Sequence, residues 1–335
     1  MSRYDAVMKM WQDWNIRSVD DLALRLDNFR ILFAYNSGKL ENAEINYHDT
    51  REIFENGKVV GYTGSTRTLF EQQNQKVCCD FLQDKIIAKE PLSIELIRDI
   101  HRALTEGTYD ERRYIVNGER PGEFKKHDYV TGKNEVGSPP DEVENDLAEL
   151  IEEVNAIGAK APLKAGAYLH ARFENIHPFA DGNGRVGRTL LNYWLMINNY
   201  PPTIVYEEDC RAYYDALQDY DEQEDLTPLA QFLEAQTVKT WSRSTEGKKA
   251  APHKKLNSEC RRHTESVHDA VFLNLPRKRC KKSGIAPNGT IPDFCLFSAN
   301  DVCKRSHIKG LQVSSRFVNA QKIAHISLIA ACAAA

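Results

Sequence analysis

Residues 177–188 have types and spacings that suit phosphate chemistry. They read HPFADGNGRVGR and lie between two apolar segments with helical spacing. Gly182 and Gly184 flank Asn183, where the backbone must turn sharply and come close to another group. The second apolar segment opens in this loop, and the unpaired N–H groups at the start of a helix form an anion site. The stretch therefore predicts a tight loop that begins a helix and binds phosphate.

The charged residues of this stretch complete a site for phosphoryl chemistry. Arg185 and Arg188 are three positions apart, so they share a helical face, and their guanidinium forks suit phosphate oxygens. Asp181 is a hard oxygen ligand of the kind that Mg²⁺ on a polyphosphate requires. His177 titrates near neutral pH, as a general base must. Each residue alone is more often structural, but their order within one short stretch favours the functional interpretation.

Amphipathic segments on both sides must position this loop. Apolar residues recur at helical spacing over residues 18–33, 66–88, 91–104, 141–156, 161–176, 184–198, 213–218 and 227–241. We expect Pro91 in the first turn of its helix, where proline is tolerated. The pattern predicts an all-α domain over residues 1–245.

Residues 114–138 break the helical pattern. They are rich in Gly, Asn, Asp and Lys, and two short alternating pieces, from Glu123 to Val130 and from Lys133 to Val136, flank Thr131-Gly132. This pattern predicts a β-hairpin flap with a glycine turn, or else a surface loop.

Residues 177–188 resemble the Fic family motif, H-x-F-x-[D/E]-G-N-G-R-x-x-R, at every fixed position. The resemblance spans residues 30–241 and implies a Fic-fold helical bundle with a small β-hairpin flap ahead of the active-site loop. Most proteins with the complete motif resemble protein adenylyltransferases, which transfer AMP from ATP to a Ser, Thr or Tyr hydroxyl of a protein target. The resemblance thus implies a nucleotidyltransferase that uses ATP as co-substrate and Mg²⁺ or Mn²⁺ as its metal.

The resemblance also implies roles for individual residues. His177 is the implied base for the target hydroxyl, Asp181 is the implied metal ligand, and Phe179 seats the loop in the core. The residues implied to bind nucleotide are Asp181, Gly182, Asn183, Gly184, Arg185, Val186, Gly187 and Arg188, with Tyr213 and Tyr214 as candidates to wall the adenine. The flap residues implied to dock the main chain of the target are Lys126, His127, Asp128, Tyr129 and Val130.

A second pattern precedes the predicted core. Residues 37–42 read SGKLEN and resemble the inhibitory motif of the family, [S/T]-x-x-x-E-[G/N]. The resemblance implies that Glu41 pairs with Arg188 and so removes the donor for the γ-phosphate. We expect Ser37 to cap a short inhibitory helix, and Asn42 fills the last position of the motif. The alternative interpretation is a surface turn with a solvated glutamate.

Other functions stay open at this point. A Fic-fold transferase can use another donor, such as UTP or CDP-choline. A rival from a different class is a non-catalytic module that senses nucleotide and contacts nucleic acid through its tail, although His177 argues against it because nucleotide binding alone needs no base. The resemblance leaves open the target protein, self-modification, removal of AMP from a modified target, and a homodimer.

The net charge of −4 over 335 residues is the sum of two unlike parts. Residues 1–250 contain 30 Lys+Arg and 43 Asp+Glu, a net charge of −13, whereas residues 251–335 contain 14 and 5, a net charge of +9. We expect residues 246–335 to be a disordered or non-native tail. The alternative is a nucleic-acid or nuclear-import patch centred on the basic residues 277–282.

The cysteines and the hydropathy pattern limit the setting of the protein. Five of the eight cysteines lie within residues 246–335 and form no C-x-x-C pair, so we expect neither zinc nor a disulfide framework. No apolar run is long enough to predict a membrane span. We predict a cytoplasmic protein with neither a membrane nor a nucleic-acid partner.

Overall fold

The computed structural model describes residues 2–130, 136–158 and 161–245, and these residues form helices and loops without a strand. The α-helices are α1 (Arg3–Asp13), α2 (Val19–Lys39), α3 (Tyr47–Asn56), α4 (Thr66–Ala88), α5 (Ile94–Thr105), α6 (Val143–Gly158), α7 (Pro162–Ile176), α8 (Asn183–Ile197), α9 (Cys210–Gln223) and α10 (Thr227–Thr245). A π-helical turn, η1 (Arg112–Val116), and a 3-10 turn, η2 (Glu207–Asp209), accompany them. The predicted all-α fold is confirmed.

Side-chain caps fix the first residues of several helices. The Oγ of Ser65 accepts the amide of Thr68 at 3.1 Å, and α4 has the bounds that its apolar pattern predicts. Helix α5 begins at Ile94, capped by Ser93. The prediction that Pro91 lies in the first turn is therefore wrong, because the serine cap starts the helix after the proline.

Helices α1 and α3 lie outside the predicted helices. The amide of Asp5 donates to Ser2 Oγ at 3.0 Å and the amide of Ser2 donates to Asp5 Oδ2 at 2.7 Å, which makes a capping box for α1. Asn46 caps α3 by accepting the amide of Asp49 at 2.9 Å. Both helices are short, so the caps are a clearer signal in the sequence than an apolar stripe.

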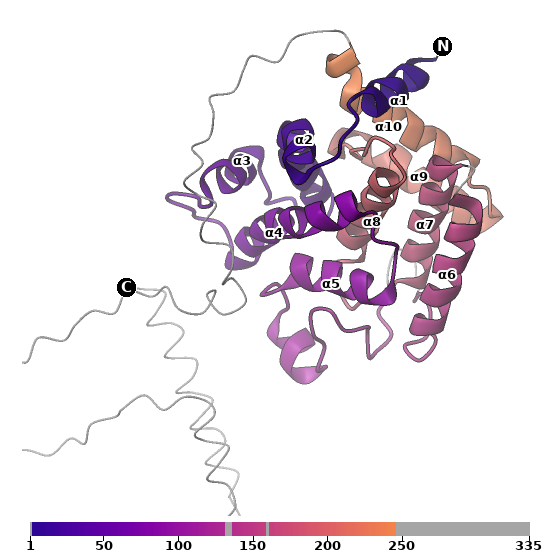
Figure 1. The fold of residues 1–335 in the computed structure, drawn as a ribbon. Coiled ribbons are helices and arrows are strands. Elements are labelled where there is room, and N and C mark those ends of the chain that lie inside the picture. The colour runs from indigo at the N-terminus through magenta and orange to yellow at the C-terminus, as the bar shows by residue number, and fades with distance from the viewer. Residues whose placement is uncertain (1, 131–135, 159–160, 246–335) are drawn as a thin grey trace, which may run out of the picture. The chain divides into compact units, whose positions relative to one another are not determined.

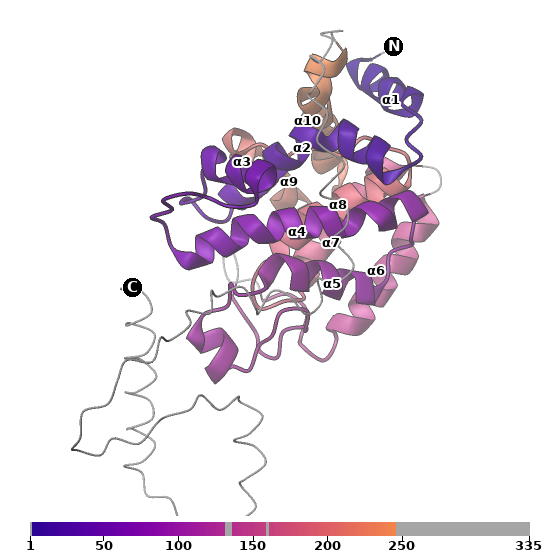
Figure 2. The ribbon, with the colours of Figure 1, turned by 60° about the vertical axis from the view of Figure 1, so that its left-hand side comes forward.

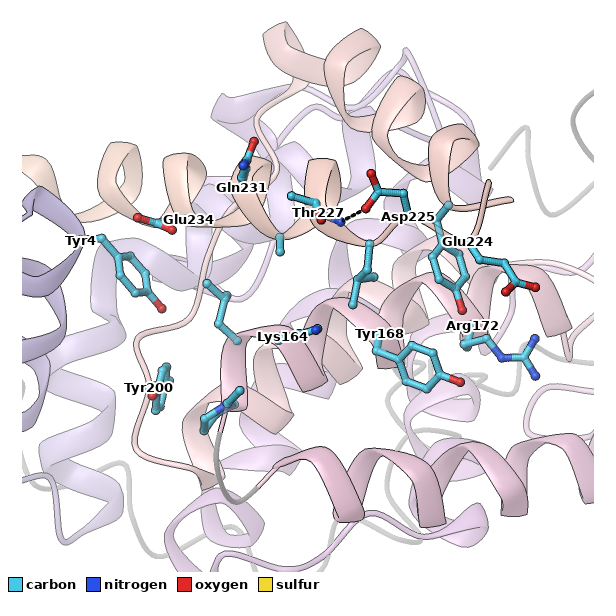
Figure 3. A pocket seen from close by; sticks show the side chains of 16 residues that line it. Tyr4, Lys164, Tyr168, Arg172, Tyr200, Glu224, Asp225, Thr227, Gln231 and Glu234 are labelled. Carbon is cyan, nitrogen blue, oxygen red and sulfur yellow. Dashed lines mark hydrogen bonds between the residues drawn. The ribbon is translucent and has the colours of Figure 1, made fainter. Parts of the chain in front are cut away.

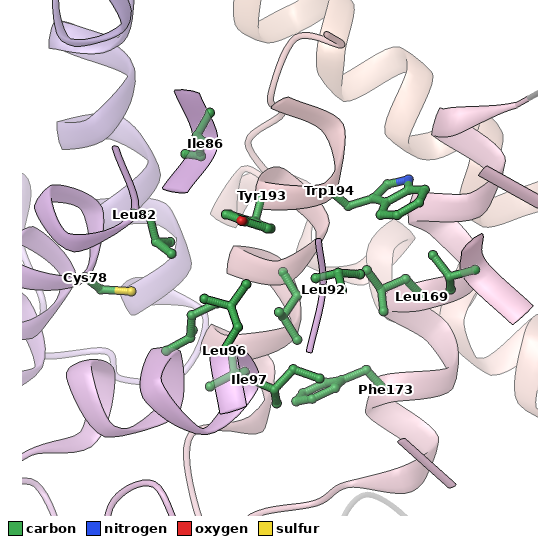
Figure 4. Packing of buried hydrophobic residues seen from close by; sticks show 14 of the residues in the cluster. Cys78, Leu82, Ile86, Leu92, Leu96, Ile97, Leu169, Phe173, Tyr193 and Trp194 are labelled. Atoms are coloured by element: carbon green, nitrogen blue, oxygen red, sulfur yellow. The ribbon is translucent and has the colours of Figure 1, made fainter. Parts of the chain in front are cut away.

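Helix α8 runs through the middle of the bundle, and α2, α4, α5 and α7 pack against it (Figure 1). Residues 185–195 of α8 are all buried. Figure 4 shows Tyr193 and Trp194 of α8 in one cluster with Leu96 of α5 and Phe173 of α7. Burial of each large apolar side chain contributes about 1.5–3 kcal/mol, so this core holds α7 and α8 firmly in relation to each other.

Aromatic side chains fasten the first helix to the last. The rings of Trp11 in α1 and Trp241 in α10 have centroids 5.6 Å apart. Phe29 of α2 stacks on Trp241 at 5.7 Å with an interplanar angle of 6°. Figure 2 shows α1, α2 and α10 gathered at one side of the bundle. The first half of α2 is therefore anchored to α10, whereas the last turn of α2 lies away from this contact.

The predicted β-hairpin flap is not found in the described part of residues 114–138, and the expected strand from Glu123 to Val130 is wrong. The amide of Lys125 donates to the Pro178 carbonyl at 2.9 Å, and the amide of Lys126 donates to the Glu119 carboxylate at 3.0 Å. These amides are bound to the motif loop and to a local side chain, so they cannot pair with a neighbouring strand. The expected turn at residues 131–132 lies outside the described residues.

The predictions on a membrane span and on the tail concern the length of the helices and the end of the chain. No helix in the described ranges combines the length and apolar character needed to cross a lipid bilayer. The predicted tail, residues 246–335, lies outside the described residues, so the predicted boundary near residue 245 stays a prediction.

Candidate active site

The loop of residues 177–182 joins two buried helices, and left-handed backbone angles bound it at both ends. His177 follows α7 with φ of 48°, and Gly182 precedes α8 with φ of 85°. A Cβ at Gly182 would meet Thr105 at 2.7 Å, so glycine is required both by the backbone angle and by the space. Phe179 is fully buried beneath the loop and contacts Phe173, which confirms its predicted packing.

His101 on α5 supports the loop from below, and the sequence analysis did not identify it. Its ring stacks on Phe179 with centroids 3.7 Å apart. Its Nδ1 accepts the amide of Gly122 at 2.8 Å, so Nε2 carries the proton and donates to the Asp181 carbonyl at 3.1 Å. Burial lowers the pKa of His101 to about 3, which keeps the ring neutral. The available signal was a histidine in register with the apolar residues of α5.

His177, the predicted base, is half-buried at the start of the loop. Burial is the main cause that lowers its pKa to about 4, and the nearby charge of Lys125 acts in the same direction. The imidazole is therefore neutral at pH 7 and able to accept a proton. A Cβ at Gly137 would meet His177 Cβ at 2.8 Å, so the segment ahead of the motif passes directly beside this residue.

Asn183, a predicted phosphate ligand, is hydrogen-bonded to the backbone of the loop. Its Oδ1 accepts the amide of Phe179 at 2.9 Å, and its Nδ2 donates to the Phe179 carbonyl at 2.7 Å. The side chain is buried, and both ends of its amide are occupied by the loop backbone. The Asn183 side chain therefore shapes the loop, and its contact with phosphate stays a prediction.

Val186 and Gly187, which are also predicted to bind nucleotide, lie against the core. Val186 is fully buried, and its amide donates to the Gly182 carbonyl at 3.1 Å. A Cβ at Gly187 would collide with the Glu174 carboxylate and lie 3.0 Å from His170 Nδ1. Neither residue presents a group to the loop side of α8.

Arg188 is buried and bound by residues 37–41. Its Nη2 donates to Glu41 Oε1 at 2.7 Å and to the Ser37 carbonyl at 3.0 Å, and its Nε donates to Ser37 Oγ at 3.0 Å. Glu41 and its neighbours raise the pKa of Arg188 against the effect of burial. A Cβ at Gly184 would collide with the Glu41 carboxylate, so this anion already lies at the first turn of α8.

The structure corrects the expected role of Ser37. Ser37 lies in the last turn of α2, not at the start of a separate inhibitory helix, and its hydroxyl accepts from Arg188. Glu41 follows the C-cap of α2, and Asn42 Nδ2 donates to Glu71 Oε2 at 2.7 Å. Residues 37–42 are therefore the end of a long helix and the turn that follows it.

Asp181, the predicted metal ligand, is held by arginines. Arg67 Nη2 donates to Asp181 Oδ2 at 2.8 Å, and Arg185 Nη2 lies 3.8 Å from Oδ1. Arg185 itself is buried, with Glu71 Oε1 3.8 Å away and the Leu104 carbonyl at 3.5 Å. No cluster of three or more His, Cys, Asp or Glu side chains in the described ranges is placed to hold a metal. A single carboxylate fits Mg²⁺ only when phosphate and water supply most of its ligands.

The two tyrosines proposed to wall the adenine have different environments. Tyr213 is 1% exposed, and its hydroxyl lies 2.6 Å from His170 Nε2, so it is a core residue with no free face for a base. Tyr214 is 47% exposed. Burial raises the pKa of Tyr214, the charge of Glu41 acts in the same direction, and the charge of Arg188 acts against them. Only Tyr214 keeps the geometry of the prediction.

Most of the predicted docking segment, residues 126–130, is exposed, and Val130 is 70% exposed. Tyr129 is the exception, because its hydroxyl donates to Glu119 Oε1 at 2.9 Å and accepts from Asn117 at 3.0 Å. His127 Nε2 lies 3.1 Å from the Asn117 carbonyl. This segment follows Lys125, whose amide is bound to the motif loop, so it is placed beside the site.

A cavity of about 1000 Å³ lies away from the motif, between the first half of α7 and the α9–α10 connection (Figure 3). It is lined by tyrosines such as Tyr168 and Tyr200, by cations such as Arg172, and by acids such as Glu234. None of the residues 177–188 lines it. This cavity therefore does not coincide with the motif, and the motif region is the better candidate site.

Residues 91–195 match the Fic/DOC family. A protein adenylyltransferase fic-1 from Caenorhabditis briggsae is 29% identical over 192 residues, which cover 56% of this chain and 36% of that protein. A protein adenylyltransferase Fic from Aedes aegypti is 42% identical over 79 residues, which cover 24% of this chain and 16% of that protein. The chain thus spans a little over a third of the first of these relatives.

Solved structures agree in fold. A Fic domain containing signaling protein from Bacteroides thetaiotaomicron superposes with a TM-score of 0.64 at 24% identity, covering 76% of this chain and all of that one. Fic-1 from Caenorhabditis elegans gives a TM-score of 0.60 at 24% identity, covering 72% of this chain and 70% of that one. The complete motif, on the loop between α7 and α8, lies within residues 91–195, the part of the chain that matches the Fic/DOC family.

Proposed function

We propose that this protein is an adenylyltransferase that transfers AMP from ATP to a hydroxyl side chain of a protein target. The observation that carries the proposal is the Glu41 carboxylate seated at the first turn of α8 and paired with Arg188 at 2.7 Å. An anion already occupies the cationic end of the motif helix, which supports the view that a phosphate group binds there. The printed names of the relatives also favour AMP transfer.

The reaction needs a base next to the phosphate site. The neutral imidazole of His177 lies in the same loop, and it is proposed to take the proton from the target hydroxyl as the oxygen attacks the α-phosphorus. The bond to the β-phosphate oxygen breaks, and pyrophosphate leaves. Backbone N–H groups at the start of α8, with Arg188, are proposed to stabilise the charge on the phosphates.

Asp181 is the residue proposed to hold Mg²⁺ or Mn²⁺. When bound with the nucleotide, the metal would neutralise phosphate charge. Asp181 is the only acidic residue within the loop of residues 177–182, and its carboxylate lies beside the arginines of the site. Residues 126–130 are proposed to dock the main chain of the target, because they are largely exposed and follow Lys125, whose amide donates to the Pro178 carbonyl.

Glu41 is proposed to inhibit the enzyme. Its ion pair removes Arg188 as a donor for the γ-phosphate, so ATP binds in a pose that cannot react. The partners of Arg188 in residues 37–41 are the ones that a γ-phosphate would have to replace. Self-modification, a homodimer, a cytoplasmic setting and Glu41-assisted removal of AMP also stay part of the proposal.

Incubation with nucleotides labelled at the α-phosphate tests the proposal. Wild-type protein and Glu41→Gly protein are mixed with labelled ATP, UTP or GTP, with and without a cell lysate. Label from ATP on a lysate protein, or on the enzyme itself, is the expected result. Label from UTP or GTP in preference to ATP contradicts the assignment of the donor, and no label from any nucleotide contradicts the proposed reaction.

A further inference from the structure

We propose that Arg67 and Glu71 of α4 are positioning residues that hold the Asp181 carboxylate while residues 41–42 are docked, and that Arg67 competes there with the divalent cation of an incoming nucleotide. This inference rests on the proposed function, because it concerns the same nucleotide site. Neither residue belongs to the motif at 177–188 or to the pattern at 37–42.

The guanidinium of Arg67 bridges two carboxylates. Its Nε donates to Glu71 Oε1 at 3.0 Å, and its Nη2 donates to Asp181 Oδ2 at 2.8 Å. The Glu71 side chain is only 4% exposed, whereas that of Arg67 is 41% exposed. A buried carboxylate is costly without a charged partner, so Glu71 retains Arg67, and the rigid fork of the guanidinium aims the second nitrogen at Asp181.

Glu71 also joins this bridge to the segment that holds Arg188. Asn42 Nδ2 donates to Glu71 Oε2 at 2.7 Å, while the preceding residue, Glu41, pairs with Arg188 at 2.7 Å. Two adjacent residues therefore reach both ends of the phosphate site. Glu41 acts directly on Arg188, and Asn42 acts through Glu71 and Arg67 on Asp181.

The bridge and a cation need the same oxygen. Mg²⁺ binds carboxylates through their lone pairs and demands near-ideal geometry, and Asp181 Oδ2 already accepts from Arg67 at 2.8 Å. Arg67 is exposed enough to turn into solvent when a cation arrives. Because coupling between two sites is reciprocal, a cation that displaces Arg67 also weakens the docking of Asn42 on Glu71.

Binding of a fluorescent ATP analogue, measured in EDTA and then in Mg²⁺, tests this competition. The readout is the Mg²⁺ factor, which is the ratio of the dissociation constant in EDTA to that in Mg²⁺ for the same protein. A general effect of the lost charge on nucleotide affinity changes both constants and cancels in this ratio. Arg67→Gln is compared with Lys76→Gln, which removes a half-buried cation of the same helix that is paired with Asp80. We expect the Mg²⁺ factor to rise about fivefold in Arg67→Gln, the upper range for a partly exposed ion pair, and to stay at the wild-type value in Lys76→Gln.

Asn42→Ala provides a second test through a residue that does not touch Asp181. We expect the Mg²⁺ factor to rise about twofold in Asn42→Ala. Adding Asn42→Ala to Arg67→Gln is expected to raise the Mg²⁺ factor by less than about twofold, because both changes act on the same bridge. An Mg²⁺ factor in Arg67→Gln equal to that of Lys76→Gln overturns the inference. Failure of all the proteins to bind the analogue overturns the proposed function as well, whereas Mg²⁺-dependent binding without AMP transfer counts against the proposed reaction alone.

Discussion

The two faces of α8 hold polar groups in opposite ways. On one face, Arg188 is paired with Glu41, whose side chain is 36% exposed, so a ligand can replace this partner. On the other face, Gly187 lies against His170 and Glu174, which are packed in the interior. Within the described residues, His170 Nδ1 and Glu174 Oε1 are buried without a hydrogen bond of normal geometry. Neighbouring positions of one motif therefore differ in role. Arg188 has a partner that a ligand can replace, whereas Gly187 packs the helix against the core.

The largest expected effect is on the ligand face. We expect His177→Ala to lower AMP transfer by about 10²–10⁴-fold, the usual loss when a general base is removed, with little change in the midpoint of thermal unfolding. His48→Ala, which removes an exposed histidine of α3, is the matched control. Transfer of label from ATP and thermal unfolding are measured on both variants. A His177→Ala protein as active as the control would remove His177 from the mechanism.

The next effect is a dependence of stability on pH on the core face. Burial raises the pKa of Glu174 from 4.5 to about 7, so the folded state binds a proton that the unfolded state releases in this range. The contribution of Glu174 is therefore fully favourable below about pH 4.5 and is lost as the pH rises through about 7. We expect Glu174→Gln to gain up to about 3 kcal/mol over wild type above pH 7, and almost nothing at pH 4.5. Urea unfolding at several pH values measures this difference, and a gain independent of pH would contradict the assignment.

The same substitution on both faces sharpens the comparison further. A Cβ at Gly187 would strike buried Glu174, and we expect Gly187→Ala to lower the free energy of unfolding by about 2 kcal/mol. A Cβ at Gly184 would strike Glu41, which can swing into solvent, so Gly184→Ala is expected to cost less than about 0.5 kcal/mol. Denaturant unfolding compares the two. Equal costs would show that the two faces do not differ in rigidity.

The smallest expected effect is the release of Arg188. We expect Glu41→Gly to raise AMP transfer about tenfold, because the γ-phosphate gains its donor when a partly exposed ion pair is removed. Glu44→Gly, a change to another acid of the same turn, is the control. Initial rates of labelling at fixed ATP concentration give the ratio. If the two variants match wild type, Glu41 has no inhibitory role.

The sequence predicted the helices best where a cap and an apolar stripe coincide. The bounds of α4 were predicted to the residue from the helical spacing of its apolar positions, and the structure shows that Ser65 caps it. Helix α1 was not predicted, because it is short and only Val7 and Trp11 are buried. The flap was predicted as a hairpin because alternation alone does not show that the amide of Lys125 is bound to Pro178.

The sequence predicted which residues belong to the candidate site, but it did not predict which side of α8 each of them occupies. The motif letters identify His177 and Arg188, yet which side of α8 Val186 occupies depends on how α7 packs against the helix. The pair of Glu41 and Arg188, 147 positions apart in the chain, came from the resemblance and agrees with the observed contact. Arg67 lies 114 positions from Asp181 and belongs to no motif, so only the three-dimensional structure reveals it.

The anchoring of α2 has a consequence for how the proposed inhibition is released. Stacking of Phe29 on Trp241 fastens the first half of this helix, while the amides of Glu41 and Asn42 bond to the Gly38 carbonyl at 3.0 and 2.9 Å in the turn at its far end. Helix ends fray with far smaller free energies than whole domains unfold. Activation would then amount to the melting of one turn, visible as rapid amide hydrogen exchange at residues 40–42 with the rest of α2 still protected.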